Sequence, residues 1–136
     1  MRVDLLVNDF VYKAVVDRCI VLFESKTKRT FLHIADAIRA YVFALDHFDK
    51  MKGGVYNVGH DTLNFSKMDI ARSVQAATGC KIIDSDMKDF DTRNFVISFG
   101  KIHKLGFEPV RTLKEGIAEM VKLYGFYRPF SAYKTI

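Results

Sequence analysis

The stretch "TKRTFLHIADAIRAY", Thr27–Tyr41, joins a short apolar strand to a helix. A basic turn leads into Arg29, the apolar residues after it predict a strand, and Asp36 stands at the start of the helical pattern. Carboxylates favour helix N-termini, so Asp36 is interpreted as capping or steadying the helix start. The alternative is an acid–base pair between His33 and Asp36.

Helical patterns surround this stretch on both sides. Apolar residues recur every three or four positions in Val3–Asp17, which predicts a helix. The helix predicted for residues 35–50 places on one side the residues Ala37, Ala40, Tyr41, Ala44 and Phe48. Two capping-box patterns open further helices: Ser66 with Asp69, ending near Gly79, and Thr112 with Glu115, running to about Tyr124.

The strand predictions complete an α/β pattern. Residues 19–23 are expected to pair with residues 29–34 in a hairpin, and further strands are predicted at 55–59, 80–84 and 95–98. Ser98 is expected to cap a short helix over 99–105. The segment "VYNV" is apolar throughout, which is typical of a strand buried on both faces, yet the chain offers few strands to flank it.

The composition fits one globular domain. The chain has 136 residues, of which 49% are hydrophobic and 27% charged, and its net charge of +5 suits an acidic ligand or is solvated surface. Cys19 and Cys80 lie far apart beside apolar runs, as expected for reduced cysteines. Polar residues interrupt the N-terminal apolar stretch, and no apolar run could span a membrane, so a cytoplasmic protein is predicted.

The best-known chemical motifs are missing from the sequence. It contains no G-x-G-x-x-G dinucleotide loop, no P-loop, no G-x-S-x-G elbow and no H-E-x-x-H motif. The four histidines show no ligand spacing, so no metal site is predicted: His33, His47, His60 and His103.

Polar residues stand where apolar strands begin or end. Arg29 precedes "TFLH", Asp91 and Arg93 precede "FVIS", and Asn57 lies within "VYNVG". Two guanidinium groups suit a diphosphate, because each can bind phosphate oxygens in a planar, bidentate way. The alternatives are a surface ion pair for each arginine, for example Arg29 with Glu24, and a turn-forming role for Asn57.

Five pieces in order carry a family resemblance: "DLLVNDFVYKAV", "KRTFLHIADAIRAYVFAL", "GGVYNVG", "NFSKMDIARSV" and "DTRNFVISFGKIHKLGFEPVRTLKEGIAEMV". From about Arg2 to Tyr124, the chain resembles the C-terminal half of the extended short-chain dehydrogenases, the NAD-dependent nucleotide-sugar epimerases and dehydratases. The resemblance implies a late strand of a Rossmann sheet and a small α/β substrate domain, without the N-terminal nucleotide-binding half. The missing half would supply the neighbours of "VYNV".

The resemblance also implies where a nucleotide-sugar would bind. The family's arginine at the position of Arg29 binds the diphosphate, and the loop before "FVIS" and the start of the first helix add contacts. The implied substrate-binding residues are Arg29, Arg93, Asp91, Lys88, Asn8, Leu5 and Leu6.

The family's cofactor glycines and catalytic Tyr-x-x-x-Lys have no counterpart in these residues. No catalytic residue is therefore predicted. NAD or NADP, the family's cofactor, is not expected to bind this chain alone.

The predicted substrate-binding half covers residues 1–124, with 33–59 packing on the missing Rossmann sheet and 125–136 forming a loose tail. The alternatives are a subunit that completes a separately encoded Rossmann half, self-association, or a basic nucleic-acid-binding module. The wide spread of the basic residues argues against the nucleic-acid module.

Overall fold

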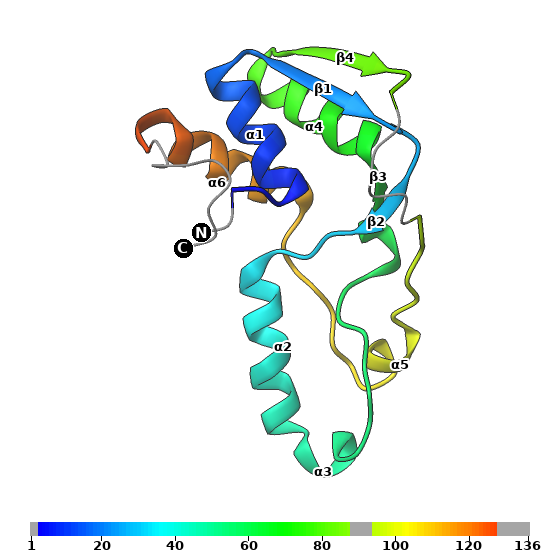
Figure 1. The fold of residues 1–136 in the computed structure, drawn as a ribbon. Helices are drawn as coiled ribbons and strands as arrows, with labels where there is room; N and C mark the ends of the chain where they lie inside the picture. The colour runs from blue at the N-terminus through cyan, green and yellow to red at the C-terminus, as the bar shows by residue number, and fades with distance from the viewer. Residues whose placement is uncertain (1–2, 88–93, 128–136) are drawn as a thin grey trace.

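A computed structural model describes residues 3–87 and 94–127, and these form a lobe with an arm that extends from it (Figure 1). The lobe comprises residues 3–32, 64–87 and 112–127, and the arm comprises residues 33–63 and 94–111. Helices and strands are interspersed along the chain, so the predicted α/β class is confirmed. No helix in the described part combines the length and hydropathy that crossing a bilayer requires.

Eleven elements build these two parts. Those of the lobe are α1 (Leu6–Val16), β1 (Cys19–Phe23), β2 (Lys28–Thr30), β3 (Asn64–Ser66), α4 (Lys67–Thr78), β4 (Lys81–Ser85) and α6 (Leu113–Phe126). Those of the arm are α2 (Ile34–Asp46), α3 (Phe48–Met51), the 3₁₀ helix η1 (Asp61–Leu63) and α5 (Gly100–His103).

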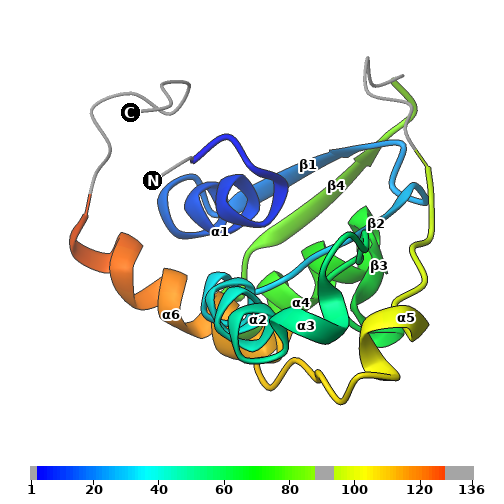
Figure 2. The ribbon, with the colours of Figure 1, turned by 90° about the horizontal axis from the view of Figure 1, so that it is seen from below.

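The lobe is a two-layer structure. Strands β1 and β4 pair in parallel, α1 and α4 pack against this sheet, and α6 packs against both helices (Figures 1 and 2). Side chains on a strand alternate between the two faces. Ile20 and Leu22 are therefore buried, whereas Val21 between them is 41% exposed. Among the described residues, helices cover one face of the sheet.

The main hydrophobic core lies between the three lobe helices and the sheet. Its helical members follow the predicted helical period: Phe10, Val11 and Ala14 from α1, Ile70, Ala71 and Val74 from α4, and Ile117 and Tyr124 from α6. The predicted capping boxes that open α4 and α6 are both formed, so each helix begins where the sequence indicates. Helix α6 continues to Phe126, so the predicted tail begins too early, and residues 128–136 lie outside the described part.

The predicted hairpin between residues 19–23 and 29–34 is wrong. Strand β1 pairs with β4, and β2 pairs antiparallel with β3. The turn between β1 and β2 is anchored to the start of α4, because the buried Lys67 Nζ donates to the Phe23 carbonyl at 2.9 Å. The turn is thus held against α4, and each of the two strands pairs with a strand that is distant in the sequence.

Two further strand predictions are also wrong, since neither 55–59 nor 95–98 forms a strand in the structure. Val55 is 84% exposed, so the expected burial on both faces does not occur within this chain. In the second segment, the Ile97 N–H donates to Asn64 Oδ1 at 3.1 Å, and Asn64 Nδ2 donates to the Ile97 carbonyl at 3.0 Å. A side-chain amide thus takes the hydrogen bonds that a neighbouring strand would have made.

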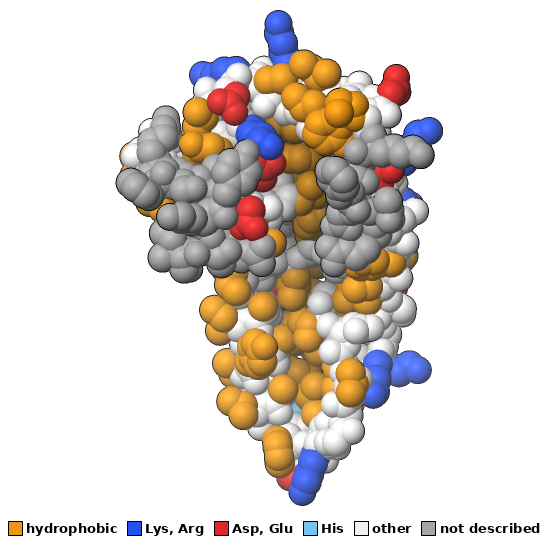
Figure 3. Space-filling view, viewed as in Figure 1, with side chains coloured by type: hydrophobic (Ala, Val, Ile, Leu, Met, Phe, Trp, Pro, Cys, Tyr) orange, Lys and Arg blue, Asp and Glu red, His pale blue; other side chains and the backbone are white. Residues whose placement is uncertain are grey.

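The helix predicted for residues 35–50 forms as α2 and α3, which meet at His47. The residues predicted to share one side of this helix differ in burial: Ala40 is buried, whereas Tyr41 is 77% exposed and Phe48 is 57% exposed. Both belong to a row of exposed apolar side chains on α2 and the start of α3, which we call the α2 apolar face (Figure 3): Ile34, Ile38, Tyr41, Val42, Leu45 and Phe48.

The arm has a small core of its own, in which Ala40 packs with Phe99, Ile102 and Phe107. Helix α5 is shorter than the predicted helix over 99–105. Its N-cap is Phe99, and no side chain caps it, so the prediction that Ser98 caps this helix is wrong.

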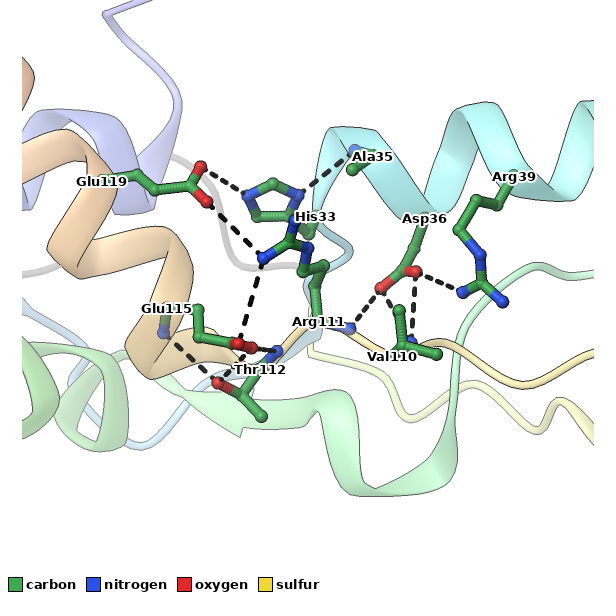
Figure 4. Close-up of polar contacts among 9 residues, drawn as sticks. All are labelled: His33, Ala35, Asp36, Arg39, Val110, Arg111, Thr112, Glu115 and Glu119. Carbon is green, nitrogen blue, oxygen red and sulfur yellow. Dashed lines mark hydrogen bonds and ion pairs between the residues drawn. The ribbon is translucent and has the colours of Figure 1, made fainter.

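The Asp36 carboxylate joins α2 to the segment that leads into α6 (Figure 4). It is fully buried and accepts hydrogen bonds from the N–H groups of Val110 at 3.1 Å and Arg111 at 2.8 Å, and from Arg39 Nη1 at 2.7 Å. The N-cap of α2 is His33, so steadying the helix start describes only part of what Asp36 does.

The contacts of Asp36 favour its charged form. Burial by itself would raise the pKa of Asp36, but the N–H groups of Arg111 and Val110 and the Arg39 guanidinium lower it below its ordinary value of 3.8. Because the pKa of Asp36 is lower in the folded state than in the unfolded state, its carboxylate stabilises the fold at pH values above the unfolded-state pKa. This stabilisation is lost as the pH falls through the folded pKa.

The variant Asp36→Asn is expected to lower the free energy of unfolding by about 2–4 kcal/mol, because a charged hydrogen bond is lost and a buried N–H is left facing an amide NH₂. Urea unfolding at neutral pH measures this loss. The matched control is Asp46→Asn, at the exposed last residue of α2, which should change the free energy by less than about 0.5 kcal/mol. Equal stability of Asp36→Asn and the wild type would contradict the role of Asp36 as a joint.

The stability difference between the wild type and Asp36→Asn is also expected to depend on pH. It should be constant above roughly pH 5 and shrink as the pH falls below the unfolded pKa of about 3.9. Asp69 and Glu115, whose pKa values are lowered by hydrogen bonds from Ser66 and Thr112, are present in both proteins and cancel in the difference. Paired urea titrations at several pH values test this, and a difference that does not change down to about pH 2 would refute it.

Candidate functional site

A groove of about 770 Å³ lies where the start of α1, residues 29–34 and α6 meet. Apolar side chains such as Leu5, Phe31 and Met120 form most of its lining. Several polar residues also line it, among them Asn8, Arg29, His33, Arg111 and Glu119. Small-molecule sites in proteins are typically apolar clefts of roughly 300–1,000 Å³ with a few polar groups, and the groove has this character.

Four of the seven predicted substrate-binding residues line this groove: Leu5, Leu6, Asn8 and Arg29. The first three lie at the start of α1. Arg29 lies in β2, where pairing with Phe65 of β3 fixes its backbone. The structure therefore brings together residues from two separate parts of the sequence. Their contact with a substrate remains a prediction.

Three of the predicted substrate-binding residues have no described position. Lys88, Asp91 and Arg93 lie outside the described residues. Asn57 lies in the arm, where its Nδ2 donates to the Ser98 carbonyl at 3.3 Å. Asn57 thus links two segments of the arm, and the interpretation that it forms a turn by bonding its own backbone is wrong.

His33 bridges α2 and α6 at the edge of the groove (Figure 4). Its Nδ1 accepts a hydrogen bond from the Ala35 N–H at 3.2 Å, so the neutral ring carries its proton on Nε2. Nε2 lies 3.1 Å from Glu119 Oε2 and donates to it. The carboxylate partner of His33 is therefore Glu119, and the suggested acid–base pair with Asp36 is wrong.

Arg111 has a fixed backbone and a weakly held side chain. Asp36 binds its N–H, but its Nη1 lies 3.9 Å from both Glu115 Oε1 and Glu119 Oε1, and its side chain is 43% exposed. Ion pairs of this kind contribute about 0–1 kcal/mol. The guanidinium of Arg111 can therefore turn toward an anion in the groove at little cost.

Sequence reasoning missed Arg111 and Glu119 as members of this site. A partial signal existed for Glu119, because it stands one turn after Glu115 and therefore lies on the same face of α6. No local pattern marks Arg111. Its position in the site depends on its N–H bond to Asp36, a residue that is far away in the sequence.

Comparison with known proteins connects this geometry to a group of enzymes. The model of the NAD dependent epimerase/dehydratase family matches residues 2–59. The probable GDP-L-fucose synthase 1 of Oryza sativa subsp. japonica is 29% identical over 96 residues, which are 71% of this chain and 29% of the rice protein. The chain thus spans less than a third of the length of that relative.

Solved epimerase structures share the fold. The UDP-glucuronic acid 4-epimerase of Bacillus cereus, in complex with UDP-glucuronic acid and NAD, matches with a TM-score of 0.78 and 21% identity over 92% of this chain and 41% of that one. The ADP-L-glycero-D-manno-heptose-6-epimerase of Helicobacter pylori matches with a TM-score of 0.71 and 25% identity over 90% of this chain and 38% of that one. The chain is therefore similar in sequence and in its α/β Rossmann-like fold to NAD-dependent nucleotide-sugar epimerases and dehydratases.

Proposed function

We propose that this chain binds a nucleotide-sugar in the groove, as the C-terminal, substrate-binding part of an NAD-dependent epimerase or dehydratase. The observation that carries the proposal is the convergence of Leu5, Leu6, Asn8 and Arg29 on one groove. These positions were derived from the family resemblance alone. Leu5, Leu6 and Asn8 are neighbours in the chain, so the support comes from Arg29, which is distant in the sequence and lines the same groove.

The charges of the groove suit a diphosphate. Arg29 and Arg111 both line it, and a guanidinium binds phosphate oxygens in a planar, bidentate way. In the proposal, Arg29 contacts the diphosphate and Arg111 leaves its weak pairs with Glu115 and Glu119 to support it. The apolar lining then packs against the base or the sugar. The net charge of +5 agrees with an acidic ligand.

The loop that contains Lys88, Asp91 and Arg93 is proposed to add further contacts to the same ligand. It precedes residues 94–97, and the Lys28 N–H, next to Arg29, donates to Asn94 Oδ1 at 2.9 Å. Asn94, which follows this loop in the sequence, is therefore held close to β2, the strand that contains Arg29.

The redox chemistry of the family is proposed to depend on residues other than these. Moving a hydride needs a bound nicotinamide cofactor, and moving the proton needs a positioned acid–base group. The 136 residues contain neither a G-x-G-x-x-G loop nor a Tyr-x-x-x-Lys pair. We expect this chain alone to bind a nucleotide-sugar, to bind NAD poorly and to leave the sugar unchanged.

The α2 apolar face is proposed to pack on the nucleotide-binding part of the enzyme. Its exposed side chains lie within residues 33–59, the segment predicted to contact that part, and Val55 adds to them. The epimerase structures are more than twice as long as the part that this chain matches, so they contain further residues that could cover such a face. A separate chain carrying the Rossmann half, or a second copy of this chain, would cover it in another way.

The first test of the proposal is a thermal melt of the chain against UDP-, GDP-, CDP- and dTDP-sugars and against NAD. A nucleotide-sugar at a hundred times its Kd should stabilise the fold by about 2.7 kcal/mol, a rise of several degrees in Tm. Arg29→Gln is expected to weaken this binding by about tenfold or more, because a charge-assisted contact with the diphosphate is lost.

The matched control for Arg29→Gln is Arg72→Gln, an exposed arginine on α4 that does not line the groove. It removes the same charge and should bind the ligand as the wild type does. Equal weakening by both variants would show that only net charge matters. Stabilisation by NAD together with turnover of a nucleotide-sugar would overturn the proposal that cofactor binding and catalysis depend on residues outside this chain.

A second test concerns the α2 apolar face. The isolated chain is expected to self-associate and to bind a hydrophobic dye, because large exposed apolar patches drive association. The double variant Tyr41→Lys, Leu45→Lys should reduce both signals, as measured by analytical ultracentrifugation and dye fluorescence. Phe126→Lys, which replaces a side chain that is 81% exposed at the end of α6, is the control and should leave them nearly unchanged. A wild-type chain that stays monomeric and silent to the dye would contradict this prediction.

A further inference from the structure

His60, His103 and Glu108 lie together in the arm, although the histidines show no ligand spacing in the sequence. One possible ligand atom from each residue lies within 4.8 Å of those of the other two. His60 directly precedes η1, His103 ends α5, and Glu108 lies in the segment between α5 and α6. None of the three lines the groove described above, so this cluster is a separate site.

The spacing of these groups is close to that of a metal site. Two ligand atoms that each lie about 2.1 Å from a tetrahedral Zn²⁺ are roughly 3.4 Å apart. His60 Nε2 lies 3.7 Å from Glu108 Oε2, and the ring centroids of His60 and His103 are 5.0 Å apart. The two rings are stacked with 27° between their planes, so binding one ion requires the rings to turn their nitrogens toward it.

Hydrogen bonds orient both imidazole rings. His103 Nε2 lies 2.8 Å from the Gly59 carbonyl, which can only accept, so Nε2 carries the proton and Nδ1 keeps its lone pair for a metal. His60 Nδ1 lies 2.7 Å from Thr62 Oγ1. Nδ1 also accepts a hydrogen bond from the Thr62 N–H at 3.2 Å, so in the neutral ring Nε2, the nitrogen beside Glu108, carries the proton. A metal ion at Nε2 displaces this proton, and Nδ1 then holds the ring proton and donates it to the Thr62 hydroxyl. Metal-binding histidines typically have such outer partners.

We propose that His60, His103 and Glu108 form a binding site for a divalent transition-metal ion, with Zn²⁺ as the best match. Two imidazoles and one carboxylate are a ligand set that Zn²⁺ uses, whereas Mg²⁺ and Ca²⁺ prefer oxygen ligands alone. The alternative is an ordinary ion pair between His60 and Glu108. The side chains of His60 and Glu108 are 37% and 59% exposed, so such a pair would contribute little stability.

The site leaves a coordination position open. His60 and Glu108 also line a pocket of about 430 Å³, whose other lining residues include Thr62 and Arg111. Three protein ligands leave a tetrahedral ion with a fourth position, which a water molecule or an anion in this pocket can occupy. The ion would tie η1, α5 and the segment before α6 together.

The test is a titration of the full chain with ZnCl₂, followed by calorimetry and by thermal melts. Binding of one ion with a rise in Tm is expected. Glu108→Gln replaces an exposed carboxylate with an amide of the same shape, so the fold is preserved, and it should weaken Zn²⁺ binding by at least tenfold. Thr62→Val, which removes the hydroxyl partner of His60, should weaken binding by roughly tenfold through loss of ring orientation.

Two controls make the result specific. His47→Gln removes a histidine whose Nδ1 is bonded within its own helix, to the Phe43 carbonyl, and it should bind Zn²⁺ as the wild type does. Cys19→Ser tests the partly exposed thiol and should also have no effect. The proposal is overturned if Glu108→Gln and His103→Gln bind Zn²⁺ like the wild type, or if Cys19→Ser abolishes binding. Either result leaves the proposed nucleotide-sugar groove untouched.

Discussion

One buried carboxylate, that of Asp36, holds the start of α2 against residues 110–111, at the point where the arm meets the lobe. It binds two consecutive N–H groups, those of Val110 and Arg111, which no helix or strand would otherwise satisfy. Since Arg111 is followed directly by the capping box that opens α6, the same carboxylate connects α2 to the helical layer of the lobe. The contact between His33 and Glu119 joins α2 and α6 a second time, but its carboxylate is 55% exposed and so contributes less.

Part of the groove depends on this joint. Its walls come from the start of α1, from the chain between β2 and α2, and from α6. Helices α1 and α6 pack together in the lobe core, and the Asp36 carboxylate holds the start of α2 beside the segment that leads into α6. The backbone and the side chain of Arg111 are held with different strength. Its backbone is fixed by a buried anion, whereas its guanidinium is loosely paired and can respond to a ligand. A rigid frame with an adaptable charge is a favourable arrangement for binding an anionic molecule.

Helix α2 is apolar on two sides. On one side, Ala40 packs in the arm core, and the other side is the exposed α2 apolar face. Helices that are hydrophobic on all sides are normally buried. The free energy of burying apolar surface, about 25 cal/mol per Å², is therefore available to whatever covers this helix. This agrees with the proposed contact to a nucleotide-binding part, and it explains why the segment around Val55 has strand-like composition without strand partners here.

The sequence by itself determined the helices, because periodicity, capping boxes and glycines act within a few residues of each other. Through the resemblance that their surroundings carry, it also predicted Arg29 and Asn8 as substrate-binding residues, and both line the groove. Only the tertiary structure decided how the strands pair, where Asp36 finds its partners and how Glu119 reaches His33. These contacts join residues far apart in the chain, so their formation depends on the closure of long loops and on competition between partners. Asn64 illustrates the competition, since its side chain took the hydrogen bonds of Ile97 that a neighbouring strand was expected to make.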